Sequence, residues 1–138
     1  MVTLQFFGHP FSSYTQKVLI ALWADETPFD YRMVDPEHPD NVAELRAHSP
    51  FGRFPLLIDG GEAIFESTPI IEHLHARHRG ANDWIPGGDG GRRTRFLDRF
   101  FDLYIMTNMQ KAGLDILRPE EARDPYGVEL ARAELRTA

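Results

Sequence analysis

The sequence predicts an α/β domain with the element order βαβαββα, followed by the start of an all-helical part. Short apolar runs of strand length alternate with longer apolar patterns of helical spacing over residues 1–79. A segment rich in Gly, Asn, Asp and Pro occupies residues 80–91, and only helical patterns follow over residues 92–138. We therefore expect residues 80–91 to be a linker between an α/β domain and a helical one.

The first four elements follow from apolar spacing. Residues 3–8 alternate between apolar and polar side chains and predict a strand, which a Gly-His-Pro sequence interrupts. Apolar residues recur every three or four positions over residues 13–24 and predict a helix. Residues 29–34 read as a second strand. After a loop with two prolines, residues 42–47 form a short helix in this interpretation.

The next block has a proline, two apolar runs and a helix start. Pro55 can begin a strand but cannot donate a hydrogen bond within it, so it stands at the entrance of the run 56–58. An Asp-Gly-Gly-Glu turn closes a hairpin onto residues 63–65, because glycine tolerates the positive φ that such a turn needs. Ser67 is the expected N-cap of a helix that ends near Gly80.

Two further helices are predicted in the helical part. Apolar residues near helical spacing predict one long helix over residues 92–117. Asp124 followed by Pro125 is a typical cap and first residue of another helix. Two helices make a small domain, so we expect the helical part to be incomplete within these 138 residues.

Composition excludes several classes of function. The formal net charge of −6 and the lack of basic runs argue against a nucleic-acid partner. The chain has no cysteine, which excludes disulfides, thiolate metal sites and a cysteine nucleophile. It also has no apolar run of about 18 residues that could span a membrane, and no signal-peptide pattern. We expect a cytoplasmic protein without a membrane partner.

Residues 49–74 resemble the glutathione-site signature of the cytosolic glutathione S-transferases, a superfamily with a thioredoxin-like first domain. The resemblance is to a bacterial, serine-type (theta- or zeta-like) member. It implies that the bond before Pro55 is cis and that the backbone of Phe54 binds the cysteinyl part of glutathione. It also implies that Glu66 and Ser67 hold the γ-glutamyl part.

In serine-type members a serine before the first helix donates a hydrogen bond to the glutathione thiolate, which makes Ser12 the candidate catalytic residue. The two adjacent serines can also be helix caps. Ser13 has Gln16 three residues later and fits a capping box, which would leave Ser12 free to face a ligand. Ser13 is the alternative to Ser12, and Tyr14 is a third candidate.

Three loop residues have weaker assignments. Arg53 could reach the glycyl carboxylate of glutathione, or it could be an ordinary solvated loop arginine. His48 is a weaker candidate for the same role. In several classes of the family an aromatic residue at the place of Phe51 inserts into a partner subunit. The resemblance therefore implies a homodimer, although a partly buried loop phenylalanine is the plain alternative.

No metal site is predicted. His73, His75 and His78 lie on one predicted helix, but the spacing i, i+2, i+5 does not put three imidazoles on one face. Tyr14 also stands where the zeta-class motif has a cysteine, which disfavours the isomerase activity associated with that class. The lack of cysteine excludes the cysteine-type classes.

The resemblance implies an enzyme that uses glutathione as its co-substrate, without a metal. It would activate the glutathione thiolate for attack on a small electrophile, a role in detoxification. The alternative is a non-catalytic binding or regulatory protein on the same fold, since fold does not fix function. A third possibility, an isolated thioredoxin-like adaptor, applies if the protein ends at Ala138.

Overall fold

The computed structural model describes residues 4–138, and the expectation for Thr3 falls outside this range. The chain divides into two compact units between Ile85 and Pro86. This division lies inside residues 80–91, the segment expected to be a linker.

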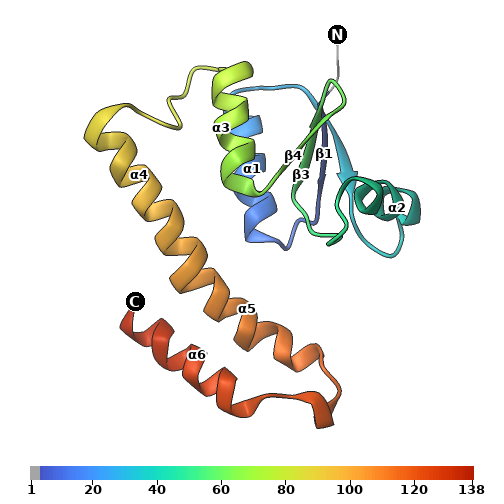
Figure 1. The fold of residues 1–138 in the computed structure, drawn as a ribbon, viewed down its shortest axis with the longest axis vertical. Coiled ribbons are helices and arrows are strands. Elements are labelled where there is room, and N and C mark those ends of the chain that lie inside the picture. The colour runs from blue at the N-terminus through green and yellow to red at the C-terminus, as the bar shows by residue number, and fades with distance from the viewer. Residues whose placement is uncertain (1–3) are drawn as a thin grey trace. The chain divides into compact units, whose positions relative to one another are not determined.

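The first unit is a four-stranded mixed sheet with helices on both faces (Figure 1). The strand order is β2-β1-β3-β4, with β1 parallel to β2 and β3 antiparallel to both of its neighbours. The predicted order βαβαββα is confirmed. The elements are β1 (Leu4–Gly8), α1 (Ser13–Ala24), β2 (Phe29–Met33), α2 (Pro39–His48), β3 (Leu56–Asp59), β4 (Glu62–Phe65) and α3 (Ser67–Arg77).

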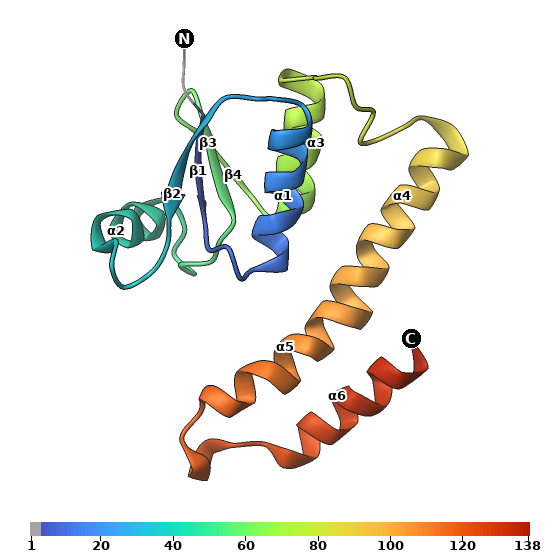
Figure 2. The same ribbon diagram turned by 180° about the vertical axis from the view of Figure 1, so that it is seen from behind.

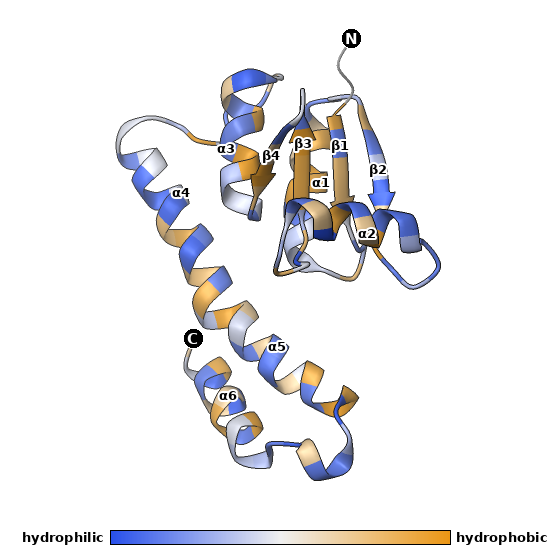
Figure 3. Ribbon diagram, turned by 45° about the vertical axis from the view of Figure 1, so that its right-hand side comes forward, coloured by the Kyte–Doolittle hydropathy of each residue, from blue (hydrophilic) through white to orange (hydrophobic). Residues whose placement is uncertain are grey.

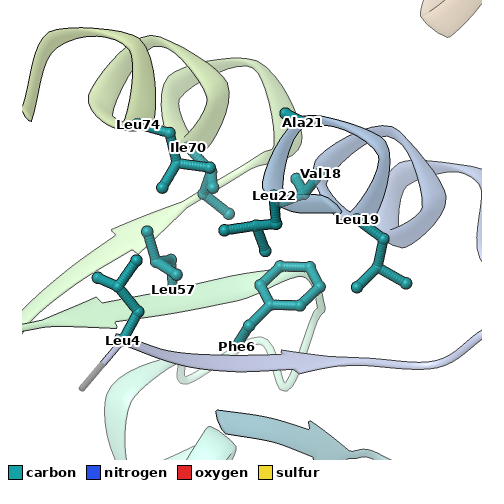
Figure 4. Packing of buried hydrophobic residues seen from close by; sticks show 9 residues of the cluster. All are labelled: Leu4, Phe6, Val18, Leu19, Ala21, Leu22, Leu57, Ile70 and Leu74. Atoms are coloured by element: carbon teal, nitrogen blue, oxygen red, sulfur yellow. The ribbon is translucent and has the colours of Figure 1, made fainter. Parts of the chain in front are cut away.

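The core has one cluster of buried side chains on each face of the sheet. Phe6 of β1 and Leu57 of β3 point toward α1 and α3, where they meet Leu22 and Ile70 (Figure 4). The neighbouring Phe7 belongs to the other cluster, beneath α2. This opposite direction follows from the two-residue side-chain period of a strand. The central strands β1 and β3 are accordingly the most buried strands of the sheet, and both are coloured mainly orange (hydrophobic) in Figure 3.

The hairpin between β3 and β4 forms as predicted. Gly60 and Gly61 have φ values of 58° and 90°, a region in which most L-residues are strained. Asp59 consequently pairs with Glu62, directly across the turn.

Helix α2 begins at Pro39, three residues before the predicted start. Proline suits the first position of a helix because its φ is already helical and its missing N–H would have no partner there. Asn41 then ties the helix start to β2, since its Nδ2 donates to the carbonyl of Met33 at 2.8 Å. The sequence interpretation placed Pro39 in a loop and so shortened the helix.

The segment after α3 is fastened to the end of α1 by Asp25. The Trp84 indole Nε1 donates to Asp25 Oδ2 at 2.7 Å, and Asn82 Nδ2 donates to Oδ1 at 2.6 Å. Burial acts to raise the pKa of Asp25, but the hydrogen bonds from Asn82, Trp84 and Gly80 outweigh it and the pKa is lowered. Residues 80–84 therefore belong to the first unit.

The second unit is a helical hairpin. Its long helix runs without a break from Gly88 to Leu117, but residues 101–106 are π-helical (Figure 2). The single α-helix predicted over residues 92–117 thus begins earlier and changes its hydrogen-bond pattern midway. The elements are α4 (Gly88–Phe100), the π-helix (Phe101–Met106), α5 (Thr107–Leu114), 3-10 turns (Asp115–Leu117 and Glu120–Ala122) and α6 (Pro125–Thr137).

Helix α6 begins as the sequence predicts. Asp124 is its N-cap and accepts a hydrogen bond from the backbone N–H of Gly127 at 2.9 Å, with Pro125 as the first helical residue. Asp124 also binds Lys111 of α5, which fastens the two helices together. Among the residues that the structure describes, no helix is long and apolar enough to cross a membrane.

Candidate functional site: the loop before α1, the cis-proline and the start of α3

The end of β1 lies unusually close to α1. A methyl group built on Gly8 would come within 2.5 Å of Thr15 Cγ2 and 2.8 Å of Thr15 Oγ1. Thr15 is fully buried, and its Oγ1 accepts a hydrogen bond from the His9 N–H at 3.3 Å. Glycine at position 8 therefore lets the β1–α1 loop lie directly against the first turn of the helix.

Ser12, and not Ser13, is the N-cap of α1. Ser12 Oγ accepts a hydrogen bond from the backbone N–H of Thr15 at 3.3 Å. The capping box predicted for Ser13 is wrong, because Gln16 does not reach back to the serine. Its side-chain Nε2 instead donates to the carbonyl of Pro10 at 2.7 Å. Ser13 Oγ is buried and has no hydrogen-bond partner within residues 4–138.

Capping uses only part of the hydrogen-bonding capacity of Ser12. A serine hydroxyl has two acceptor lone pairs and one O–H donor, and the cap occupies one lone pair. The donor can therefore still serve a ligand, so capping and ligand binding are compatible for this residue. The positive end of the α1 dipole lies at the same place and favours a negative ligand atom.

The loop that leads to β3 meets the β1–α1 loop through aromatic rings. The Phe54–Pro55 peptide bond is cis. The Phe54 ring lies 6.3 Å from the imidazole of His9, whose other neighbour is Phe11 at 5.5 Å. His9 thus links the loop of Ser12 to the cis-proline, a contact that sequence reasoning missed because the two segments are about 45 residues apart.

The start of α3 has an unusual backbone. Glu66 is the N-cap, with φ 67° and ψ 140°, a conformation rarely adopted by residues other than glycine. Such strain is often found where a loop is shaped for a ligand. Ser67 was predicted to be the N-cap, but it is the first helical residue and is almost fully buried. Glu66 O instead accepts the first helical hydrogen bond, from Ile70 N at 3.1 Å.

A cavity of about 500 Å³ lies in the first unit between the loop that leads to β3 and the start of α3. Arg53, Phe54, Pro55 and Glu66 of the predicted site line it. Neither the Arg53 guanidinium nor the Glu66 carboxylate has an ion-pair partner in the part of the chain that the structure describes, so both charges are available to a ligand. The complete lining is His48, Ser49, Pro50, Phe51, Arg53, Phe54, Pro55, Phe65 and Glu66.

Two predicted site residues, Ser12 and Ser67, are absent from the lining. Ser67 directly follows Glu66 and contributes the N–H of the first helical residue, which no carbonyl inside the helix can accept. Sequence reasoning did not include Phe65 in the site. Its alternation with the inward-facing Ile64 on β4 could have indicated that Phe65 faces outward.

A separate cluster lies at the other ends of β3 and α3. His73 Nε2 and His78 Nε2 both contact Asp59 Oδ2, at 2.8 Å and 2.6 Å. A hydrogen bond from His78, which has the larger effect, and one from His73 hold the pKa of Asp59 below its usual value. His75 lies apart, with Nε2 3.5 Å from Asp83 Oδ1. The three histidines do not converge, but two of them meet a carboxylate that the sequence interpretation did not consider.

A mixed sheet of this order, with a cis-proline before β3 and helices on both faces, defines a thioredoxin-like domain. Residues 6–82 match the family model described as the N-terminal domain of glutathione S-transferase. Since this match covers more than half of the chain, the protein belongs to the glutathione S-transferase family.

Individual relatives agree with this assignment. The chain is 38% identical to glutathione S-transferase F6 of Arabidopsis thaliana over 77 residues, which are 54% of this chain and 36% of the relative. It is 25% identical over 109 residues to the dichloromethane dehalogenase of Methylorubrum extorquens, covering 76% of this chain and 36% of that protein. The chain thus matches little more than a third of the length of these curated relatives.

The fold also matches solved structures. A glutathione S-transferase from Methylobacillus flagellatus, solved with glutathione bound, superposes with a TM-score of 0.79 at 24% identity. The superposition covers 98% of this chain and 66% of that one. Both units therefore have counterparts in the fold of the family.

Proposed function

We propose that the protein is a serine-type glutathione S-transferase, in which Ser12 donates its hydroxyl proton in a hydrogen bond to the glutathione thiolate. The proposal rests chiefly on Ser12, whose oxygen caps α1 while its O–H remains able to donate. The thiolate then attacks a small electrophile. The thiol proton leaves to solvent, and no covalent enzyme intermediate is needed.

The required change in the thiol is modest. A free thiol with a pKa near 8.5 is mostly protonated at neutral pH, and lowering the pKa by one unit takes about 1.4 kcal/mol. A hydrogen bond to a charged acceptor contributes about 1.5–3 kcal/mol. One hydroxyl, together with the positive end of α1, is thus able to lower the thiol pKa by about one to two units.

The charges around the cavity suit the rest of glutathione. Glu66 can pair with the α-amino group, and the N–H groups at the start of α3 can bind the adjacent γ-glutamyl carboxylate. Arg53, on the same cavity, can pair with the glycyl carboxylate. The backbone of Phe54, before the cis-proline, is available to the cysteinyl part.

The direct test is a calorimetric titration with glutathione, combined with the thiolate absorbance of bound glutathione across pH. We expect saturable binding and a thiol pKa one to two units below that of free glutathione. Binding without this shift would refute the transferase and favour the alternative, a non-catalytic sensor or carrier. No binding by the folded protein would refute both.

Adjacent serines provide a matched pair of variants. Ser12→Ala should raise the thiol pKa most of the way to that of free glutathione, leaving only the effect of the α1 dipole, whereas Ser13→Ala should leave the pKa lowered. Because Ser12→Ala also removes a cap worth about 0.5–2 kcal/mol, Ser12→Gly is the second variant, since glycine as cap loses only a few tenths of a kcal/mol. Equal thiol pKa values in Ser12→Gly and the wild type would refute the role of Ser12.

The remaining parts of the proposal concern partners and location. Phe51 is 84% exposed, and we propose that it inserts into a second copy of the protein to form a homodimer. Light scattering should then detect a dimer in the wild type and a monomer in Phe51→Ser. A dimeric Phe51→Ser would refute this use of Phe51. The cytoplasmic location and the role in detoxification stay predictions.

A further inference from the structure

Three potential metal ligands lie close together in the first unit, one each from Asp59, His73 and His78. One ligand atom from each residue lies within 4.8 Å of the other two. Their side chains are 18%, 11% and 30% exposed, so the cluster is mostly buried but can be reached from solvent. Asp59 ends β3, His73 lies on α3, and His78 is the C-cap of α3.

The convergence of the two histidines depends on the end of the helix. Residues five apart on a regular α-helix point about 140° away from each other. His78, however, has left the helical conformation, with φ −128° and ψ 40°, while its N–H still bonds to the carbonyl of Leu74. The imidazoles of His73 and His78 consequently lie with ring centroids 5.9 Å apart, on either side of one carboxylate oxygen.

We propose that Asp59, His73 and His78 bind a first-row transition-metal dication, with zinc as the best match. Two imidazole nitrogens and a carboxylate oxygen are a ligand set that zinc uses, with a fourth position left to water. Imidazole ligands favour Zn²⁺, Ni²⁺ and Cu²⁺ over Mg²⁺ and Ca²⁺, which prefer sites made of oxygens.

Binding requires only a small rearrangement. Tetrahedral zinc with bonds of about 2.0–2.2 Å holds its ligand atoms about 3.4 Å apart. The contacts of Asp59 Oδ2 with the imidazoles, at 2.6 and 2.8 Å, must therefore open by somewhat less than 1 Å. Without metal, each Nε2–H donates to the carboxylate. With metal, each Nε2 lone pair becomes the ligand and the ring proton resides on Nδ1.

The proposed metal site is separate from the proposed glutathione site. Asp59 and Pro55 flank opposite ends of β3, and His78 follows the end of α3 whose first residue is Ser67. The ends of an eleven-residue helix lie about 15 Å apart. A metal here would link the end of β3 to the end of α3 and stabilise the first unit without taking part in thiol chemistry.

The test uses the full, untagged chain after removal of metals with a chelator. Zinc binding is measured by competition with a chromophoric chelator, without glutathione, because its thiol binds zinc itself. We expect one Zn²⁺ per chain, and Co²⁺ in its place should give the visible absorption of a tetrahedral site. The absence of saturable one-to-one binding would overturn the proposal.

Variants on one helix supply the controls. His78→Gln and Asp59→Asn should each weaken zinc binding at least about tenfold, whereas His75→Gln should change it less than twofold. Equal weakening by His75→Gln and His78→Gln would indicate unspecific surface binding and overturn the site. His78 is the most exposed of the three ligands, so its variant is the one best able to fold, which circular dichroism verifies. Unchanged affinity in folded His78→Gln also overturns the proposal.

Discussion

Gly8→Ala should destabilise the first unit through a single side chain, Thr15. The added methyl group would lie 2.5 Å from Thr15 Cγ2 and 2.8 Å from Oγ1, both far inside van der Waals contact. Thr15 is fully buried and β-branched, so it has little freedom to turn away. Either Thr15 or the β1–α1 loop must therefore move.

The magnitude can be worked out from the contacts involved. Overpacking of a buried position typically costs about 1–3 kcal/mol. Displacement of Thr15 also weakens the hydrogen bond from the His9 N–H, which contributes about 0.5–1.5 kcal/mol. Alanine has less conformational entropy than glycine in the unfolded chain, which offsets about 0.4–1 kcal/mol of this destabilisation. We expect a net loss of about 1–3 kcal/mol in the free energy of unfolding.

A double-mutant cycle assigns this loss to the Gly8–Thr15 contact. Thr15→Ala removes both atoms that the new methyl group would meet. The double variant should therefore be more stable than the sum of the two single effects predicts, by at least about 1 kcal/mol. A coupling energy near zero would show that the strain arises elsewhere.

Urea unfolding followed by tryptophan fluorescence is the appropriate assay. The two tryptophans of the chain, Trp23 and Trp84, both belong to the first unit, so the signal reports that unit. Gly113→Ala is the control for a methyl group that would meet nothing within 4 Å; because Gly113 lies in the second unit, its unfolding is followed by circular dichroism, and the midpoint should not fall. A Gly8→Ala protein within about 0.5 kcal/mol of the wild type would refute the reasoning, since that change is typical of substitutions without such contacts.

Phe6→Ala should reduce the free energy of unfolding by about 3–5 kcal/mol in the same urea assay, because Phe6 is fully buried; a loss below 1 kcal/mol would contradict this packing. The pKa of Asp25 is lower in the folded protein than in the unfolded chain, so the ionised carboxylate stabilises the fold at any pH above its pKa in the unfolded chain. This stabilisation is lost as the pH falls through the pKa of Asp25 in the folded protein. Trp84 fluorescence should therefore change in this acid range and not at neutral pH, and Asp25→Asn should abolish the change; the same titration in both proteins would refute it. Asp124→Ala should lower the helix content measured by circular dichroism, because it removes the α6 cap and the Lys111 bond; unchanged helicity would count against this role.

Sequence reasoning predicted the order of elements well because local signals determine them. The apolar spacing of α1 and the Gly60-Gly61 turn act over a few residues, and both agree with the structure. Pro39 shows the limit of such signals, since proline is typical both of loops and of the first turn of a helix.

The candidate site was less predictable, and its errors have physical causes. Ser12 and Ser13 are equally good caps by residue type; Ser12 is the cap in the structure, and Gln16 binds the Pro10 carbonyl instead of completing a capping box with Ser13. Glu66 is the N-cap of α3 with a positive φ, a backbone conformation that the residue type of glutamate does not predict. The cluster of Asp59 with His73 and His78 joins residues 14 and 19 positions apart, and it depends on how the hairpin places β3 beside α3.

The π-helical segment at Phe101–Met106 affects any sequence alignment of the long helix with the corresponding helix of related proteins. A π-turn closes its hydrogen bond over five residues instead of four, so it accommodates one extra residue. The residues after it are therefore offset by about 100° from the positions that an uninterrupted α-helix would give them. A helical wheel drawn continuously from Gly88 would assign the residues of α5 to the wrong side. Deleting one residue between Phe101 and Met106 should restore a uniform α-helix and leave Lys111 facing Asp124.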